Sequence, residues 1–269
     1  MKKLKNKNIG LAVAACACLA LFLILTALVL FVDVAAAGES GARVGLSHIN
    51  ETVFNDLGKN GAFKKITDIC AGVGALTIAF FVGLFIFQWI KRKSLKKIDL
   101  DLYFALAAGV LALVFYVFFE LVVVNCRPIL IDGGFEKSYP SSHTMFVTIF
   151  VGVGVVEAFL RLKKEWAKWL VFAAGVCVML LGGVGRLFAG VHWLTDVIAG
   201  YLLGGAVVFA FAYIAFRFKD LKETGNKDEN NDDIKPDKNK QETNENLSDE
   251  KIENNITENS EIKLEENIN

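Results

Sequence analysis

Six apolar stretches, each close to the length that crosses a bilayer, constrain the fold of this chain more than any other feature. A transmembrane helix needs about 20 predominantly apolar residues. The stretches cover residues 9–32, 69–90, 102–124, 143–160, 169–188 and 193–216. Hydrophobic residues make up 54% of the chain, which is high for an ordinary soluble domain. The expected fold class is all-α, a bundle of six transmembrane helices.

Lysine and arginine gather in alternate connections between these stretches. The basic segments are 1–8, 91–97, 161–168 and 217–222. Short loops rich in these residues stay in the cytoplasm, so both termini are expected there. The remaining connections then lie on the extracytoplasmic side, and they are 33–65, 125–142 and 189–192. The expected location is a multi-pass protein of a bacterial plasma membrane.

The N-terminus has a competing interpretation. Its basic start, apolar run and the following VAAAGES resemble a secretory signal with a cleavage site. The apolar run of 9–32 is longer than the usual 7–15 residues of a signal peptide, which favours an uncleaved first helix. Cleavage would leave five spans.

The C-terminal tail differs in composition from the rest of the chain. From Arg217 onward, 16 acidic residues outnumber 9 basic ones, and no aromatic residue follows Phe218. Such a segment is expected to be disordered and cytoplasmic. The predicted organisation is a first helix with its outer loop (1–65), a transmembrane core (66–218) and the tail (219–269).

Several classes of protein lack support in the sequence. No glycine-rich nucleotide loop and no basic–aromatic pattern is present, so no nucleic-acid partner is expected. The sequence contains no internal repeat of the kind that many transporters have, so it gives no support for a transporter. The five cysteines have neither metal-ligand nor disulfide-framework spacing and are expected to pack as small hydrophobic residues. Gly200 and Gly204 fit close helix packing inside the bundle, with a homodimer through them as an alternative.

His192 and Asp196 are the first pair of polar residues that needs a reason. Residues four apart share one face of a helix, and an acid inside a span is costly. A carboxylate can accept the Nδ1 hydrogen of histidine and leave Nε2 free to react. The alternative is a purely structural hydrogen bond. His48, in the long outer loop, is expected at the surface.

His143 follows Pro140, Ser141 and Ser142, a sequence typical of a helix start. That helix would begin on the extracytoplasmic side, with its free N–H groups able to bind an anion. Ser141 or Ser142 is expected to cap it.

Arg127 and Arg186 fall at the same predicted depth as the two histidines. Each alone fits snorkelling at the interface. Together with the histidines, the aspartate and a helix N-terminus, their forked donors suit phosphoryl transfer. No metal-ligand spacing appears in the sequence, so no metal or other cofactor is expected.

These residues resemble the three motifs of the type 2 phosphatidic acid phosphatase superfamily, whose membrane members have six spans. The motifs are K-x6-RP, PSGH and SR-x5-H-x3-D. Here they read Glu120-x6-Arg127-Pro128, Pro140-Ser141-Ser142-His143 and Gly185-Arg186-x5-His192-x3-Asp196. The resemblance covers about residues 70–216 and places the active site at the extracytoplasmic ends of the last four spans.

The resemblance implies a role for each matching residue. His192 would be the nucleophile that forms a phosphohistidine, Asp196 would orient it, and His143 would be the general acid. The implied phosphate-binding residues are Arg127, Arg186, Ser141 and the backbone near Ser142. Members of this family work without a metal and mostly dephosphorylate lipid phosphates or diphosphates.

Three positions depart from the motifs. Gly185 replaces a serine and loses a hydroxyl, while Ser142 replaces a glycine and adds bulk near the phosphate. Glu120 replaces the lysine, and seven residues is about two helical turns, so Glu120 is expected below Arg127 on the same helix face. Glu120 would pair with Arg127 or Arg186. The second hypothesis is that Lys137 supplies the missing cation.

The leading interpretation is a metal-independent membrane phosphatase that hydrolyses lipid phosphomonoesters or polyprenyl diphosphates. A phosphotransferase with the same phosphohistidine is an alternative enzyme. An inactive lipid-binding member is the non-enzymatic alternative, supported by Glu120 and Gly185 and opposed by the complete set of catalytic residues.

Overall fold

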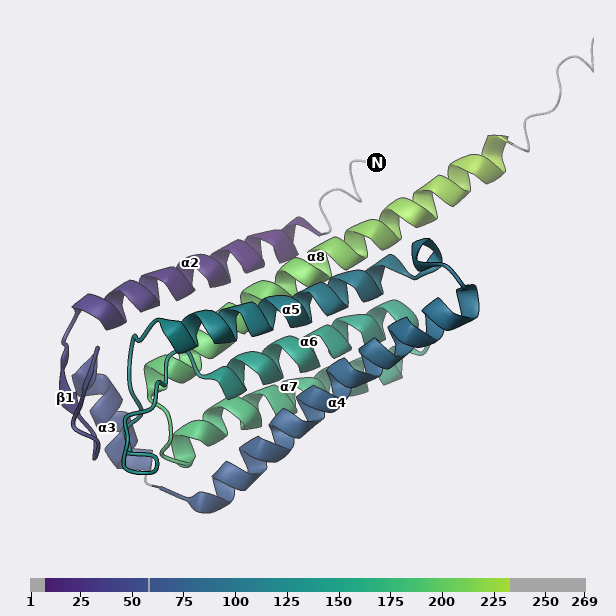
Figure 1. Ribbon diagram of the computed structural model, residues 1–269. Coiled ribbons are helices and arrows are strands. Elements are labelled where there is room, and N and C mark those ends of the chain that lie inside the picture. Colours follow the sequence, from purple (N-terminus) through teal and green to yellow (C-terminus); the bar gives the residue numbers. More distant parts are fainter. Residues whose placement is uncertain (1–7, 58, 233–269) are drawn as a thin grey trace, which may run out of the picture. The chain divides into compact units, whose positions relative to one another are not determined.

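Six long helices make up most of the computed structural model, which describes residues 8–57 and 59–232 (Figure 1). They are α2 (Ile9–Phe31), α4 (Gly61–Arg92), α5 (Leu100–Leu121), α6 (Ser142–Arg161), α7 (Glu165–Phe188) and α8 (Leu194–Asp232). Each is long and apolar enough to cross a membrane, α8 through its segment Leu194–Leu221. The prediction of six spanning helices is confirmed.

The connection between α2 and α4 is folded rather than a plain loop. It contains an antiparallel hairpin of β1 (Ala35–Ala37) and β2 (Ala42–Val44), followed by helix α3 (Ser47–Leu57). Gly38 and Gly41 both have positive φ angles, which glycine adopts without steric cost and which a tight hairpin turn requires. The chain is therefore not entirely helical. A short 3-10 helix, η1 (Leu95–Lys97), links α4 to α5.

Helix α6 lies at the centre of the bundle. It packs against α4, α5 and α7, and α4 also packs against α7 (Figure 1). In the most apolar 18-residue stretch of each helix, 56% of the residues of α6 are buried, compared with 11% of those of α2. Large apolar side chains stay exposed along α2, α4 and α5, as expected of surfaces that face lipid.

Glycines let α8 approach α6 closely. A Cβ added at Gly200 would lie 2.8 Å from the Thr144 Cβ, and one at Gly204 would lie 2.8 Å from the Thr148 Cβ. The predicted packing role inside the bundle is confirmed for both glycines. Because α6 covers this face, a homodimer through these glycines does not fit; association through another surface stays a prediction.

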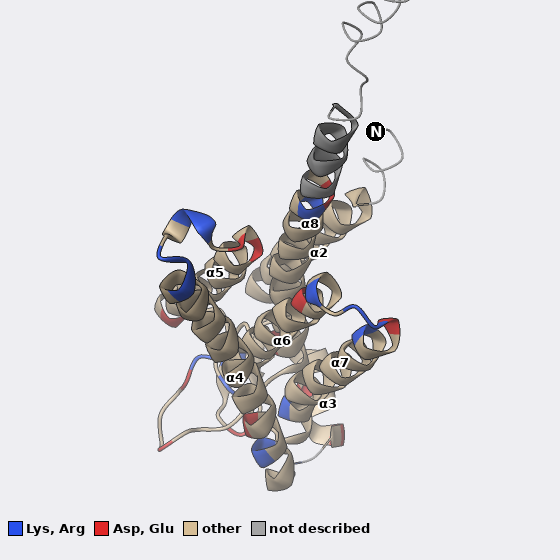
Figure 2. Cartoon of the chain, turned by 90° about the vertical axis from the view of Figure 1, so that its right-hand side faces the viewer, with Lys and Arg blue, Asp and Glu red and all other residues tan. Residues whose placement is uncertain are grey.

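Charged residues gather towards the helix ends and the connections, while the middle parts of the helices are largely uncharged (Figure 2). Glu157 lies near the end of α6 and is 1% exposed. Its Oε2 is 2.6 Å from Nε of Arg161, whose Nη2 also lies 2.5 Å from an Asp101 oxygen. A buried carboxylate needs such a partner, so these contacts account for the acid in the fourth span without assigning it to catalysis.

The predicted boundary of the tail at residue 219 falls within helix α8. Helix α8 continues to Asp232, because a helix already formed adds one backbone hydrogen bond per residue and the residues after 218 include good helix formers such as Lys and Glu. The remainder of the predicted tail, 233–269, lies outside the described residues.

Candidate active site

Five helix ends meet at one end of the bundle and bring the predicted site residues together. These are the starts of α4, α6 and α8 and the ends of α5 and α7. The segments 122–141 and 189–193 join them. His143 and Asp196 come from helices, whereas Arg127 and His192 come from the two connecting segments.

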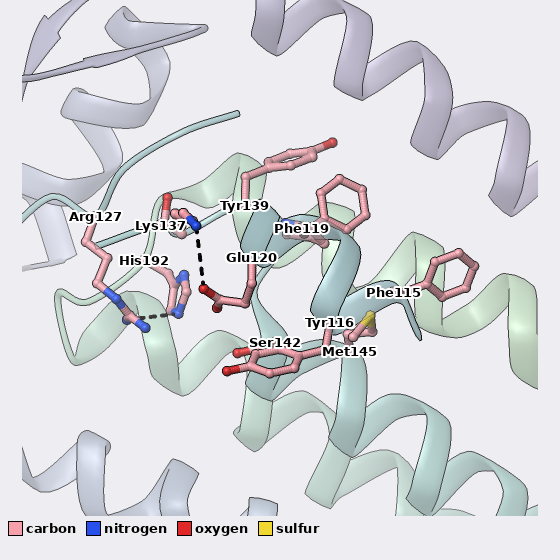
Figure 3. Close-up of a pocket in the computed structure, with 12 residues that line it drawn as sticks. Phe115, Tyr116, Phe119, Glu120, Arg127, Lys137, Tyr139, Ser142, Met145 and His192 are labelled. Carbon is pink, nitrogen blue, oxygen red and sulfur yellow. Dashed lines mark hydrogen bonds and ion pairs between the residues drawn. The ribbon is translucent and has the colours of Figure 1, made fainter. Parts of the chain in front are cut away.

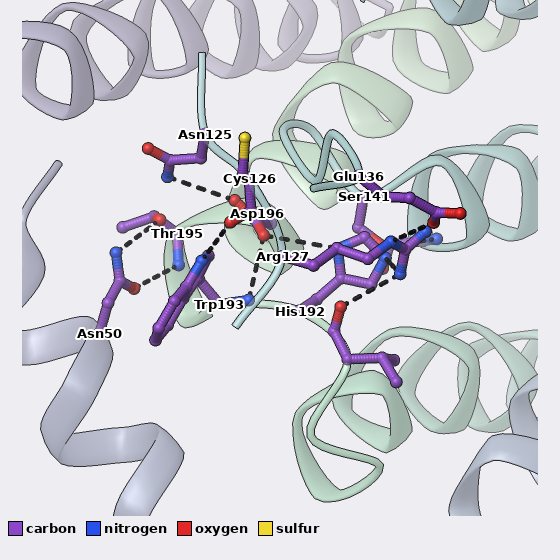
Figure 4. A network of polar contacts seen from close by, with 12 residues as sticks. Asn50, Asn125, Cys126, Arg127, Glu136, Ser141, His192, Trp193, Thr195 and Asp196 are labelled. Carbon is purple, nitrogen blue, oxygen red and sulfur yellow. Dashed lines mark hydrogen bonds and ion pairs between the residues drawn. The ribbon is translucent and has the colours of Figure 1, made fainter. Parts of the chain in front are cut away.

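His192 and Asp196 form the predicted pair. The His192 Nδ1 lies 3.4 Å from the Asp196 Oδ2, and the two residues are 2% and 0% exposed (Figure 4). His192 precedes the first turn of α8 rather than sitting on it, so the pair does not depend on a shared helix face. Catalytic hydrogen bonds are often long without substrate and tighten when it binds. The contact favours the tautomer with hydrogen on Nδ1 and a lone pair on Nε2.

The Asp196 carboxylate has further donors. Its Oδ2 accepts the Trp193 backbone N–H at 3.0 Å, and its Oδ1 is 3.5 Å from Asn125 Nδ2. The Asn125 side-chain oxygen in turn accepts the N–H of Gly45. A buried carboxylate held by several donors can serve as a fixed orienting group for His192.

The folded connection of β1, β2 and α3 supports this end of α8. Asn50 accepts the Thr195 backbone N–H at 3.1 Å and donates to its hydroxyl at 2.9 Å. Trp193 is fully buried against Phe54 and donates its indole N–H to the Cys126 carbonyl at 2.7 Å (Figure 4). These contacts fix Trp193 and Thr195, which precede Asp196, and none of them was predicted from the sequence.

Arg127 contacts the reactive side of His192. Its Nη1 lies 3.2 Å from His192 Nε2 and donates to the Val191 carbonyl at 3.1 Å, while its Nε is 3.0 Å from Glu136 Oε2. A guanidinium at Nε2 stands where a phosphoryl group must approach. A bound phosphate would therefore find both a nucleophile and a cation at this point.

His192 is held in its neutral form. Burial lowers its pKa well below the ordinary value of 6.5, and the positive charges of Arg127 and Arg186, with His143, lower it further. The backbone of Ser138 acts weakly in the opposite direction. A neutral imidazole with a free Nε2 lone pair is the form that attacks phosphorus.

Arg186 lies at the end of α7 and is 4% exposed. Its Nη1 is 3.2 Å from the Thr67 hydroxyl oxygen and 3.6 Å from Asp68 Oδ1, both on α4. A Cβ added at Gly185 would lie 2.6 Å from the methyl carbon of Thr67. Glycine at 185 thus makes room for Thr67, whose hydroxyl contacts the arginine where the motif's serine is absent.

The start of α6 has the predicted cap. The Ser141 Oγ accepts the Thr144 N–H at 3.4 Å, and the Ser141 N–H donates to the Asp196 carbonyl at 3.0 Å. By helix geometry the N–H groups of Ser142 and His143 have no acceptor within α6 and remain available to an anion. His143 faces α4, with Nε2 3.4 Å from Asp68 Oδ1.

A pocket opens beside His192 and contains Glu120 and Lys137 (Figure 3). Its polar lining also includes Arg127 and Ser142. Its apolar lining comes from Phe115, Tyr116, Phe119, Tyr139, Pro140 and Met145. The lining places charged groups that can bind an anionic head next to aromatic side chains that can contact an apolar chain.

The expected position of Glu120 is wrong. Helix α5 ends at Leu121 and Val122 is extended, so Arg127 does not lie above Glu120 on one helix. Glu120 pairs with neither arginine, and its Oε2 is 3.9 Å from the Nζ of Lys137. The hypothesis that placed Lys137 near the site agrees with this geometry, since Lys137 lines the pocket together with Arg127 and His192.

The predicted residues are thus gathered at one site, and Asp68, Thr67, Asn125 and Glu136 join them unpredicted. The sequence feature that could have identified Asp68 as a site residue is an acidic residue at the end of a span. Among residues 8–57 and 59–232, no group of three or more His, Cys, Asp or Glu side chains is arranged to hold a metal.

Six helices long enough to span a membrane bring two histidines, an aspartate and two arginines together at one end, and this arrangement suits phosphoryl transfer. Residues 100–220, somewhat less than half of the chain, match the PAP2 superfamily. This match and the site together support a phosphatase that acts in a membrane.

Similar proteins are found in bacteria and archaea. The chain is 27% identical over 158 residues to the bacitracin transport permease protein BcrC of Bacillus licheniformis, covering 56% of this chain and 71% of that one. It is 38% identical over 74 residues to the undecaprenyl-diphosphatase of Sulfolobus acidocaldarius, which covers 28% of this chain and about a third (32%) of that relative.

The fold is similar to that of a solved structure, the transmembrane PAP2-type phosphatidylglycerolphosphate phosphatase from Bacillus subtilis. The TM-score is 0.53 at 20% sequence identity, and the match covers 77% of this chain and 96% of that one. At this level of sequence identity, the similarity shows a shared fold and nothing about the substrate.

Proposed function

We propose that the protein hydrolyses a lipid phosphate through a phosphohistidine on His192, without a metal ion. The observation that carries the proposal is the arrangement around His192, with Asp196 at Nδ1 and Arg127 at Nε2. This arrangement supplies an oriented neutral nucleophile and a cation at the atom that attacks.

Two steps account for the reaction. His192 Nε2 attacks phosphorus, the bond to the leaving oxygen breaks, and His143 gives that oxygen a proton. Water then attacks the phosphohistidine, gives its proton to His143 and releases phosphate with neutral His192. Arg127 and Arg186, with the N–H groups at the start of α6, would stabilise the charge on the phosphoryl oxygens throughout.

A polyprenyl diphosphate is the preferred substrate in this proposal, with lipid phosphomonoesters next. The pocket beside His192 has an aromatic wall for an apolar chain and Lys137 for additional negative charge. The undecaprenyl-diphosphatase similarity supports the same class. The site would lie on the extracytoplasmic side of the bacterial plasma membrane.

The test is phosphate release by protein purified in detergent, in the presence of EDTA. Substrates are undecaprenyl diphosphate, phosphatidic acid, phosphatidylglycerol phosphate and a soluble phosphomonoester. We expect release from at least one lipid substrate and complete loss in His192→Ala. Release that requires metal, or that survives His192→Ala, would refute the mechanism. Absence of release from every substrate would instead support an inactive lipid-binding protein.

A further inference from the structure

Asp68 contacts two residues of the site although it lies outside all three motifs and outside the matched region 100–220. It belongs to α4, and a single carboxylate oxygen, Oδ1, is 3.4 Å from His143 Nε2 and 3.6 Å from Arg186 Nη1. The side chain is 53% exposed, so it lies at the open edge of the site. One acid thus joins the general acid of the proposed reaction to a phosphate-binding arginine.

The position of Asp68 is fixed by its neighbour. Thr67 is fully buried, donates its hydroxyl to the Lys64 carbonyl at 2.8 Å and receives a hydrogen bond from Arg186. Its methyl group fills the space that Gly185 leaves open. These contacts fix α4 against α7, and they therefore hold Asp68 in a constant position relative to His143.

His143 needs such a partner for electrostatic reasons. A general acid must carry its proton when the leaving group departs, but a protonated imidazole beside the Arg186 guanidinium is repelled by it. Arg127, from the segment 122–141, adds a second positive charge to the site. Asp68 is the acid that contacts His143, and its negative charge offsets this repulsion.

We propose that Asp68 is a positioning residue that favours the protonated form of His143 and orients it as the general acid. The carboxylate holds one ring N–H of His143, and the other N–H is the one transferred to the leaving oxygen as the P–O bond breaks. Asp68 keeps its charge throughout, and water restores the proton during hydrolysis of the phosphohistidine. This inference rests on the proposed function and extends it to a residue of α4.

The test compares two leaving groups in Asp68→Asn. An alkoxide leaving from a lipid phosphomonoester needs a proton, whereas p-nitrophenolate leaves without one. We expect kcat/KM, which reports the phosphorylation step and not the later hydrolysis, to fall about 100-fold for the lipid phosphomonoester and to stay within about 3-fold for p-nitrophenyl phosphate. His143→Gln should show the same selectivity. Asp56→Asn, an exposed acid on α3, is the matched control and should leave both rates unchanged.

Each other outcome has a distinct meaning. An equal fall for both substrates, or no fall, would overturn the role in proton transfer. Faster turnover or tighter binding by Asp68→Asn would also overturn it, because the carboxylate would then be competing with phosphate for Arg186. Asp68→Glu retains the charge and should recover most of the lost kcat/KM; if it behaves like Asp68→Asn, the proposal fails.

Failure of the proposed function gives a different pattern. His192→Ala should abolish release from both substrates. If it does not, or if the wild-type protein releases phosphate from neither, the phosphohistidine mechanism is refuted and the role of Asp68 falls with it. If Asp68→Asn affects both substrates equally while His192 remains essential, only the inference about Asp68 is refuted.

Discussion

At the scale of single residues, His192 is held at both ring nitrogens, and in the proposed mechanism these contacts decide which atom reacts. Asp196 takes the Nδ1 side and Arg127 the Nε2 side. Burial of the ring then removes the charged form at neutral pH. A solvent-exposed histidine would be partly protonated near pH 6.5 and would lose part of its nucleophilicity there.

The lowered pKa of His192 predicts the pH dependence of activity. The neutral imidazole persists as pH falls through 6.5 and becomes protonated only well below that value. The acid limb of kcat/KM that belongs to the enzyme should therefore lie well below pH 6.5. The pH profile of kcat/KM should be measured for two substrates whose phosphates ionise at different pH. A limb caused by the enzyme stays at the same pH for both substrates, whereas a limb caused by the substrate shifts. A common limb at or above 6.5 would contradict the prediction.

Lys137 is the second residue whose position carries a prediction. It lines the pocket and its pairing with Glu120 is loose, at 3.9 Å with both side chains a third or more exposed. Lys137→Ala should raise KM for a diphosphate about 10-fold, the loss of one charged contact. Lys163→Ala, an exposed lysine remote in sequence from the site, is the control. An unchanged KM in Lys137→Ala would exclude the lysine from substrate binding.

At the scale of elements, the site depends on how closely α8 approaches α6. The backbone N–H of Ser141 donates to the Asp196 carbonyl, so a hydrogen bond joins the starts of the two helices. Gly200 lies one turn further along α8, where an added Cβ would be 2.8 Å from the Thr144 Cβ and 2.9 Å from the Ser141 carbonyl oxygen. Backbone atoms cannot move aside as a flexible side chain can.

Gly200→Ala should separate the two helix starts. We expect a loss of stability of about 1–3 kcal/mol from overpacking. We also expect a fall in kcat of about 100-fold, because small displacements of catalytic groups are costly. Thermal unfolding in detergent and phosphate release measure the two effects. Gly83→Ala in α4, where nothing lies within 4 Å of the new Cβ, should change neither, and equal behaviour of the variants would contradict this account.

At the scale of the whole molecule, an even number of spans puts both ends of the membrane region on one side. The basic segments 91–97 and 161–168 then lie opposite the active-site end. By the charge rule we expect this basic side to be cytoplasmic and the site to face outward. A lipid head group at the outer surface could reach it while the chain stays in the bilayer.

Cysteine labelling tests this orientation. In a variant without the five native cysteines, a membrane-impermeant maleimide should label Phe135→Cys in intact cells, because this exposed residue lies in the segment 122–141. Leu95→Cys, exposed in η1 at the opposite end, should react only after permeabilisation. Labelling in the reverse order would place the site in the cytoplasm.

The sequence by itself determined the spans and the candidate site residues. Runs of about 20 apolar residues leave the backbone no alternative to helix in a membrane, because every N–H and C=O must be bonded internally. The spacing of the three motifs selected Arg127, His143, Arg186, His192 and Asp196 as candidates, and their catalytic and binding roles stay predictions.

Only the tertiary structure decided how these residues are supported. Asp68 meets His143 and Asn50 meets Thr195 across long intervals of sequence, through side chains whose partners no local pattern specifies. The same holds for Glu120, which pairs with Lys137 because α5 ends at Leu121 and the chain after it is extended. Apolar length fixes a helix locally, but a contact between side chains depends on where distant helices end, and that is settled by packing.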